Sequence, residues 1–411
     1  MTDPTILIIG TWDTKDDELH CLASVIRAQG GRVRTMDVSV LGDPSQPTDH
    51  SKHEVAAEGG HSIREAIDGG DENRAMQIMA KGASLLAARL HAESKVDGVL
   101  ILGGTMGTDL ALDVALALPL GVPKYIVSTV SFSPLMPPDR IPADVQMILW
   151  AGGLYGLNSV CKASLSQAAG AVLGAARAVE RPDRTKPLIG MTSFGKTVLR
   201  YMVPLKPALE KRGFEVAVFH ATGMGGRAFE ALAAQGAFAC VMDFATQEVG
   251  NHIHGSAISA GADRLTAAGR NGTPQMVAPG CYDLVDLAGW QPVPDALADL
   301  PSHAHNRLLS SVVLDADRRR AVARAHAERL AQATGPTVLL LPEGGCNEWD
   351  RPGADLHDAE GLAAFLQEMR ATCPDTCTRV DVDAHINDAA FADTVLNLFD
   401  GWLADGTVAR P

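Results

Sequence analysis

The stretch VDGVLILGGTMGT, residues 96–108, decides the fold class. It opens with a short apolar run, residues 96–102, which is typical of a strand buried in a parallel sheet. Three glycines and two threonines follow at once, and a segment of helical period begins at Thr108. Glycine allows a tight turn and a close backbone approach, and the N–H groups at the start of a helix favour phosphate. The stretch therefore predicts a strand, a loop at residues 103–108 that holds a polyphosphate, and a helix.

The same alternation of short apolar runs with helical stretches continues in both directions from this loop. In the first half, strands are expected at residues 5–9, 32–38, 96–102 and 124–127, and helices at 16–29, 73–93, 108–117 and 159–179. In the second half, strands are expected at 187–190, 215–220, 239–243, 275–278, 337–341 and 379–382, with helices that include 318–333 and 359–370. This order predicts an α/β protein with two Rossmann-like domains, in which helices flank mainly parallel sheets.

The chain of 411 residues is long enough for two domains of about 150–200 residues each. Residues 180–186, ERPDRTK, are polar, include a proline and follow an alanine-rich helix. Such segments are typical of linkers. We predict a nucleotide-binding domain at residues 1–183 and a second domain, for a substrate or a partner, at residues 184–411.

Composition limits the environment and the partners of the chain. The formal net charge is −14 and lysine and arginine form no run, so neither nucleic acid nor an anionic membrane is an expected partner. The seven cysteines are scattered without a CxxC pair, as expected of reduced thiols in a cytosol. The sequence shows no signal peptide and no apolar run near the roughly 20 residues that span a bilayer. These features predict a cytoplasmic protein.

Ligands of parallel α/β sheets bind where strands end, so the residues after each first-half strand are the expected nucleotide ligands. Residues 10–15, GTWDTK, follow the first strand, and Asp37 ends the second, where Rossmann proteins hold a ribose. Either segment can instead serve only to cap a helix or a turn. The sequence predicts nucleotide contacts from Thr11, Asp13, Thr14, Asp37, Gly103, Gly104, Thr105, Gly107, Thr108, Ser128 and Thr129.

The order of these motifs resembles a known family. GTWDTK, the DV at residues 37–38, GGTMGT and the STVS at residues 128–131 are followed by GCYDLVD, LPEGG and HINDAAFAD. This order resembles a two-domain family related to the ATP-binding N-terminal half of the tomato mosaic virus resistance protein. The resemblance implies ATP as the ligand of the first domain, self-association into homodimers or higher homo-oligomers, and a TIM-barrel protein as partner. It implies no established enzymatic activity.

A rival nucleotide site lies in the second half. GMTSFGKT, residues 190–197, matches the GxxxxGK[ST] string of a P-loop, and Asp243 ends a strand where it can hold Mg²⁺. In a P-loop NTPase, Lys196 would reach the terminal phosphates and Thr197 the metal. Two prolines interrupt the segment that should form the following helix, which argues against a P-loop.

Two histidine pairs in the second half make a metal-dependent hydrolase or lyase a further alternative. Each pair has the spacing that places both side chains on one face of an extended segment, as metal ligands require. Histidines that make hydrogen bonds or face solvent are the simpler interpretation, since no tight ligand motif accompanies them. The residues are His252, His254, His303 and His305.

The segment after the expected strand at 337–341 supplies two catalytic candidates. Glu343 can act as a general acid or base, and Cys346 as an exposed thiol, unless that cysteine is an inert core residue. Further polar residues expected to line the same cleft of the second domain as Glu343 and Cys346 are Arg264, Asp283, Asn306 and Asn347.

Taken together, the sequence predicts a protein that binds ATP in its first domain, with Mg²⁺ left open, and a small acidic or carbonyl-containing metabolite in a cleft between the domains. It defines no catalytic residue. The open alternatives are the metal-dependent hydrolase or lyase, the P-loop NTPase at residues 190–197, and a nucleotide-controlled partner of a TIM-barrel protein.

Overall fold

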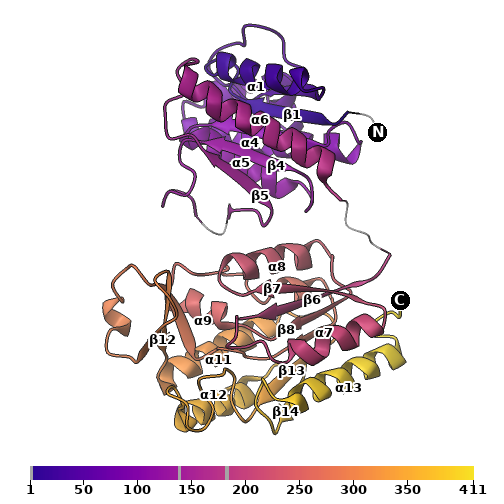
Figure 1. Cartoon of the computed structure of the whole chain (residues 1–411), viewed down its shortest axis with the longest axis vertical. Helices are drawn as coiled ribbons and strands as arrows, with labels where there is room; N and C mark the ends of the chain where they lie inside the picture. Colours follow the sequence, from indigo (N-terminus) through magenta and orange to yellow (C-terminus); the bar gives the residue numbers. More distant parts are fainter. Residues whose placement is uncertain (1–2, 138–139, 181–184) are drawn as a thin grey trace. The chain divides into compact units, whose positions relative to one another are not determined.

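The computed structural model describes residues 3–137, 140–180 and 185–411 (Figure 1). Contacts within the chain divide it into two compact units, Met1–Pro182 and Asp183–Pro411, and each is described by itself. Each is built on a parallel sheet flanked by helices, so the predicted fold class is confirmed. The predicted linker at residues 180–186 falls largely on residues 181–184, which lie outside the described part of the chain.

The sheet of the first unit has five parallel strands in the order β2-β1-β3-β4-β5. Every residue of β1 and β3 is buried, because successive side chains enter cores on opposite faces of the sheet, Leu7 on one face and Ile8 on the other. This two-sided burial is why both strands are unbroken apolar runs in the sequence. The strands are β1 (Thr5–Gly10), β2 (Arg32–Asp37), β3 (Gly98–Gly103), β4 (Lys124–Ser128) and β5 (Val145–Leu149).

Helices cover both faces of this sheet (Figure 1). On one face α1 (Asp16–Ala28) packs against α6 (Ser159–Ala178). On the other face α4 (Glu72–Ala92) packs against α5 (Thr105–Ala117), with the short α2 (Lys52–Glu58) and α3 (Ile63–Asp68) beside them.

The strand order of the first unit reverses beside β1. The chain places β2 on one side of β1 and then crosses to place β3 on the other side. Open α/β sheets bind ligands in the crevice outside the carboxyl ends of the strands at such a switch point. In this unit the crevice lies between Gly10, which ends β1, and Gly103, which ends β3.

The second unit repeats this order with one more strand. Its parallel sheet runs β14-β13-β9-β8-β6-β7, so its switch point lies between β6 and β8. The strands are β6 (Leu188–Ser193), β7 (Glu215–His220), β8 (Cys240–Asp243), β9 (Gln275–Val277), β13 (Thr337–Pro342) and β14 (Cys377–Val382). A separate antiparallel sheet, in the order β10-β12-β11, is inserted after β9 and consists of β10 (Leu284–Ala288), β11 (Ser302–Ala304) and β12 (Leu309–Val313).

Helices again cover both faces of the larger sheet. One face carries α7 (Met202–Lys211) and α13 (Ala389–Asp405), whose side chains share one core with β6, β8 and β13. The other face carries α8 (Met224–Ala234), α10 (Ala267–Arg270), α11 (Ala316–Leu330) and α12 (Ala359–Thr372). The short α9 (Gln247–Ile253) follows β8, and a single 3₁₀ turn, η2, spans Asp295–Leu297.

Some sequence-based expectations need correction. α5 begins at Thr105, three residues earlier than predicted, so Gly107 and Thr108 belong to its first turn and not to a flexible loop. Neither β5 nor the antiparallel sheet is predicted. β5 and β11 are short and partly exposed, and in the mostly buried β10 and β12 polar residues, Asp286 and the serines at 310–311, interrupt the apolar run. None of the described helices combines the length and the apolar character needed to span a membrane.

Candidate functional site

The switch-point crevice of the first unit contains a pocket of about 380 Å³. The loops after β1, β2 and β3 and the start of α4 enclose it. Seven of the predicted nucleotide ligands line it, namely Thr11, Asp13, Thr14, Gly103, Gly104, Thr105 and Gly107. The other lining residues are mainly apolar (Val38, Val40, Leu41, Ala75, Met76 and Met106), with Lys15 and Glu72 as further charged groups. Both predicted glycine-rich segments therefore face one cavity.

The glycines at the end of β3 have different roles. A Cβ on Gly103 would lie 2.5 Å from the Cα of Gly107 and 3.1 Å from the amide nitrogen of Thr108, so only glycine lets α5 begin this close to the strand end. A Cβ on Gly104 would meet only the hydroxyl oxygen of Thr129, at 3.8 Å. Packing therefore requires glycine at position 103, whereas Gly104 faces open space.

α5 begins at the pocket without a side-chain cap, because its N-cap residue is Gly104. The first N–H groups of a helix lack partners within the helix and carry partial positive charge. No acidic residue lies in the first turn of α5, whereas α1 begins with Asp16, Asp17 and Glu18. The start of α5 is therefore the better anion-binding end of the two.

The loop after β1 is anchored by Trp12. Its ring is buried, and its Nε1 donates to the carbonyl oxygen of Met36 at 3.0 Å. The next residue, Asp13, lines the pocket and accepts from the amide of Gly42 at 2.9 Å through Oδ2. Its Oδ1 is buried and has no hydrogen-bond partner among the described residues. Because an unpaired buried carboxylate oxygen costs free energy, Oδ1 is available to a donor or cation of a ligand.

Asp37, the predicted ribose ligand, lies outside the pocket lining. Its carboxylate is buried and accepts from the amide of Trp12 at 3.3 Å and from the amide of Ser39 at 2.9 Å. Burial raises the pKa of this carboxyl, against the effect of the Ser39 hydrogen bonds. The structure thus uses Asp37 to join the loops after β1 and β2.

Thr108, Ser128 and Thr129 also lie outside the lining. The Thr108 hydroxyl donates to the carbonyl oxygen of Gly104 at 2.7 Å and lies 2.6 Å from the Ser128 hydroxyl oxygen, which is buried. The amide of Thr129 donates to the carbonyl oxygen of Gly103 at 3.3 Å. These groups fix the turn between β3 and α5, so the hydroxyl of Thr108 is already used within the protein.

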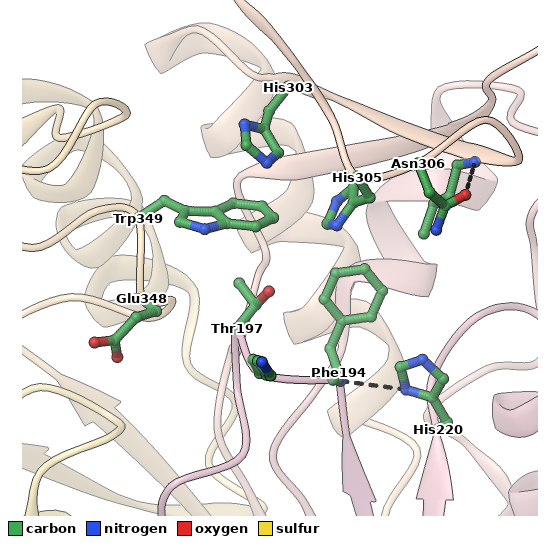
Figure 2. A pocket seen from close by; sticks show the side chains of 11 residues that line it. Phe194, Thr197, His220, His303, His305, Asn306, Glu348 and Trp349 are labelled. Atoms are coloured by element: carbon green, nitrogen blue, oxygen red, sulfur yellow. Dashed lines mark hydrogen bonds between the residues drawn. The ribbon is translucent and has the colours of Figure 1, made fainter.

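A second pocket, of about 410 Å³, lies in the second unit and is formed by that unit alone (Figure 2). Five of its eleven lining residues carry aromatic rings. His303 and His305 lie 4.3 and 4.8 Å from the ring of Trp349, centroid to centroid, and Phe194 stacks on His220 at 5.7 Å. The other lining residues are Gly195, Lys196, Thr197, Asn306, Leu309 and Glu348. The structure thus brings the turn after β6, the end of β7, the β11–β12 hairpin and the segment after β13 together.

The switch-point crevice of the second unit is filled by the protein itself. Arg264 is fully buried there, and its guanidinium pairs with Asp243 and with two further buried carboxylates, Glu248 at 2.7 Å and Glu230 at 3.2 Å. Burial raises the pKa of Glu248 to about 7, although the charge of Arg264 and hydrogen bonds act against this shift. Asp243 also accepts from the hydroxyl of Thr192 at 2.7 Å, so it is not free to hold Mg²⁺ as a P-loop NTPase would need.

The string at residues 190–197 does not form a P-loop. Gly190 lies inside β6, where a Cβ would lie 2.8–2.9 Å from two phenylalanine rings, so this glycine serves packing. The chain then forms a turn in which the amide of Phe194 donates to the carbonyl oxygen of Val198 at 3.1 Å, and α7 starts only at Met202. A P-loop instead wraps a phosphate and enters its helix directly.

The four predicted metal ligands do not come together. His303 and His305 share a pocket, with ring centroids 5.3 Å apart. His252 lies in α9 and His254 at its end, so this pair is not on an extended segment as predicted. Among the described residues, no group of three or more His, Cys, Asp or Glu side chains is arranged to hold a metal ion.

Neither catalytic candidate lines the second pocket. The Glu343 carboxylate is exposed and pairs with Arg370. Cys346 is 0% exposed, and burial raises the pKa of its thiol well above the ordinary value, so the exposed thiol considered from the sequence is absent. Asp283 and Asn347 are buried together, with Asn347 donating to Asp283 at 2.9 Å.

Sequence reasoning missed four residues of the second pocket, the apolar Leu309 among them. His220 ends the predicted strand at residues 215–220, so inspection of strand ends would have identified it. Glu348 and Trp349 follow the LPEGG segment without any motif of their own, and only the folded chain shows that they reach the histidines.

Comparison with known proteins assigns the family. The model of the Uncharacterised protein family (UPF0261) N-terminal domain matches residues 4–181, and that of its C-terminal domain matches residues 186–403. A UPF0261 protein of Brucella melitensis is 54% identical over 407 residues, which are 99% of this chain and 97% of that protein. A UPF0261 protein of Clostridium tetani is 34% identical over 390 residues, which are 94% and 96% of the two chains.

More distant proteins are also similar to the chain. The ToMV resistance protein Tm-1 of Solanum lycopersicum is 29% identical over 424 residues, covering 96% of this chain and 55% of that protein. Among solved structures, the thioesterase domain from the curacin biosynthetic pathway is 13% identical, with a TM-score of 0.27 over 53% of this chain and 93% of that chain, which is too weak to carry an argument. The two family models together cover nearly the whole chain, which therefore belongs to the UPF0261 family.

Proposed function

We propose that the first unit binds ATP in its switch-point pocket. The observation that carries this proposal is the open space beside Gly104, at the uncapped start of α5. A glycine that packing does not require, at a helix start where strand order reverses, is the arrangement by which α/β sheets accept phosphate groups.

The start of α5 and Lys15 support the same orientation. Phosphates next to residues 104–107 would meet the free N–H groups of α5 and no acidic side chain of its first turn. Lys15 lines the pocket and supplies a cation; its ammonium lies 5.1 Å from the ring centroid of Tyr155. Electrostatic positioning by these groups requires no nucleophile.

The remaining wall suits the other parts of a nucleotide. Val38, Val40 and Met76 give an apolar surface on which a base can lie. The unpaired Oδ1 of Asp13 can accept from a ribose hydroxyl or hold Mg²⁺. Mg²⁺ would add a counter-charge for the phosphates.

Titration calorimetry with ATP tests the proposal through Gly104→Val. The Cβ of the added side chain would meet no backbone atom, and its methyl groups would extend into the space assigned to phosphate, so ATP affinity should fall at least about tenfold. Gly174→Val is the matched control, because Gly174 lies on α6 and a Cβ there would meet no atom within 4 Å. Equal ATP affinity in wild type and Gly104→Val, with both folded, would contradict the site.

Three further features belong to this proposal: self-association and a TIM-barrel partner, which the family resemblance implies, and a small metabolite as a second ligand. Light scattering gives the oligomeric state. Co-purification with the TIM-barrel protein, with and without ATP, tests whether nucleotide controls association. If the same amount of complex forms with and without ATP, nucleotide does not control the association.

A further inference from the structure

The pocket of the second unit contains a hydroxyl group that the fold does not use. Thr197 is only 5% exposed, and its hydroxyl has no hydrogen-bond partner among the described residues. Figure 2 shows this hydroxyl directed toward the space between Trp349 and Phe194. The backbone of Thr197 is held in place, because its carbonyl oxygen accepts from the Asn387 side chain at 2.9 Å and from the amide of Glu348 at 3.0 Å. The hydroxyl thus opens into the pocket from a residue that is otherwise buried and held in place, so it is available to a ligand.

His305 is oriented by a hydrogen-bond chain that begins in the core. The hydroxyl of Ser311 donates to the buried carboxylate of Asp286 at 2.6 Å. The same hydroxyl oxygen lies 2.9 Å from Nε2 of His305. Since the only hydroxyl proton of Ser311 is used toward Asp286, Nε2 must be the donor in the second contact. Nδ1 of His305 then carries a lone pair and has no partner among the described side chains.

His220 is fixed in the same tautomer by a backbone group. The amide of Gly195 donates to Nδ1 of His220 at 3.3 Å, so the proton of a neutral His220 is on Nε2. His220 and His305 therefore present opposite groups, the first an N–H donor and the second an acceptor.

The net charge available to a ligand in this pocket is positive. Lys196 lines it and forms no ion pair with any carboxylate in the described part of the chain. The carboxylate of Glu348 is turned aside, where it pairs with Arg200 at 3.0 Å and accepts from Asn387 at 3.0 Å (Figure 2). The ammonium of Lys196 therefore remains available to a ligand, and the carboxylate of Glu348 does not compete for it.

We propose that this pocket binds a small 2-hydroxycarboxylate, with its carboxylate received by Lys196, Thr197 and the Nε2–H of His220 and its hydroxyl donating to Nδ1 of His305. The carbon skeleton lies against Phe194 and Trp349. This assignment gives the chemical class of the second ligand and so rests on that part of the proposed function, but it does not depend on ATP. Ser311 and Asp286 are positioning residues, because they act on the ligand only through His305.

Binding of three related probes separates the parts of this proposal. Mandelate has the carboxylate and the hydroxyl, mandelamide lacks the charge, and phenylacetate lacks the hydroxyl. Calorimetry on the full chain should show saturable binding of mandelate. The affinity for mandelamide should be lower by about tenfold or more, since hydrogen bonds to charged groups are strong. The affinity for phenylacetate should be lower by about fivefold, since a neutral hydrogen bond contributes about 1 kcal/mol. Thr197→Val and Lys196→Ala should each lower mandelate affinity about tenfold, whereas Lys211→Ala, outside the pocket, should not.

The role of His305 has its own readout. His305→Gln should abolish the preference for mandelate over phenylacetate, while His303→Gln should keep it. Long-range ¹H–¹⁵N spectra of the histidine rings should show the Nε2–H tautomer of His305 in the wild type and a tautomer mixture in Ser311→Ala, which a purely structural serine would not produce.

Two results would overturn the site. If millimolar mandelate does not bind, or binds no better than mandelamide, the carboxylate assignment is wrong. If mandelate binds equally well to Thr197→Val and Lys196→Ala, it binds elsewhere. None of these binding experiments contains nucleotide, so either result would leave the ATP proposal untouched.

Discussion

The two units share a strand order but treat its switch point differently. In the first unit, the crevice between β1 and β3 is open and ends in Gly104 and the uncapped start of α5. In the second unit, the crevice between β6 and β8 is filled by Arg264 and its buried carboxylates. The pocket there lies instead beside β7 and the β11–β12 hairpin.

This difference shows that topology alone does not locate a site. A switch point leaves a crevice, and the side chains decide whether a ligand or the protein fills it. In the second unit, three buried carboxylates around one guanidinium take up that space. An inserted antiparallel sheet supplies new pocket walls, including His303 and His305.

The largest expected effect comes from emptying the filled crevice. Arg264→Met removes the only cation that the described residues place among Asp243, Glu230 and Glu248, so buried carboxylates would lose their counter-charge. We expect the free energy of unfolding of the second unit to fall by about 3–5 kcal/mol. Urea denaturation followed by circular dichroism measures it.

Arg212→Met is the control for this change. Arg212 pairs with the exposed Asp400, and such pairs contribute only about 0–1 kcal/mol. Similar losses for both variants would mean that the network around Arg264 is no more important than a surface ion pair.

The second effect is a pH dependence of stability that comes from Asp286. This residue lies at the buried end of the hydrogen-bond chain that runs through Ser311 to His305. Burial raises the pKa of Asp286 from 3.8 to about 6, so the folded state holds this proton more tightly than the unfolded state does. The contribution of Asp286 to stability is therefore present below about pH 4 and is lost as the pH rises through 6. Relative to Asp286→Asn, the wild type should lose about 3 kcal/mol over this range.

The control for the sign is Asp400→Asn. The hydrogen bond from Arg212 lowers the pKa of Asp400, so the stabilising effect of this carboxylate should appear as the pH rises and vanish in acid. Unfolding free energies of the three proteins across the pH range give both slopes. A pH-independent difference between wild type and Asp286→Asn would show that Asp286 titrates normally.

The sequence predicts the sheets far better than the sites. Buried strands such as β1 and β3 have apolar side chains on both faces, and this pattern survives in a single sequence. The half-exposed β5 leaves no such pattern. Strand ends also indicate where ligand loops lie, and the loops after β1 and β3 do line one pocket.

The sequence does not show which residue in a loop touches the ligand. Asp37 and Thr108 are polar and follow strands, yet their groups are used within the protein. The pairing that decides this depends on contacts between distant segments, such as the contact of Ser128 with Thr108. For the same reason, Lys196 belongs to a P-loop string in the sequence and to an aromatic pocket in the structure.

The smallest expected effect on stability distinguishes the adjacent glycines of the open crevice. Gly103→Ala places a methyl group 2.5 Å from the backbone of Gly107, so the first unit should lose about 1–3 kcal/mol of unfolding free energy. Gly104→Ala meets no atom closer than 3.8 Å and has a backbone conformation open to alanine, so stability should change by no more than about 0.5 kcal/mol. Thermal unfolding of both variants measures the difference.

ATP affinity should rank the same two variants in the opposite order, provided that both are folded when binding is measured. In Gly104→Ala, the methyl group enters the space assigned to phosphate, so ATP affinity should fall while the fold is unchanged. Gly103→Ala, studied at a temperature where it stays folded, should keep more of its ATP affinity, because its methyl group faces α5. If Gly104→Ala destabilises the unit as much as Gly103→Ala, then Gly104 serves packing, and the open crevice loses the feature that distinguishes it from the filled one.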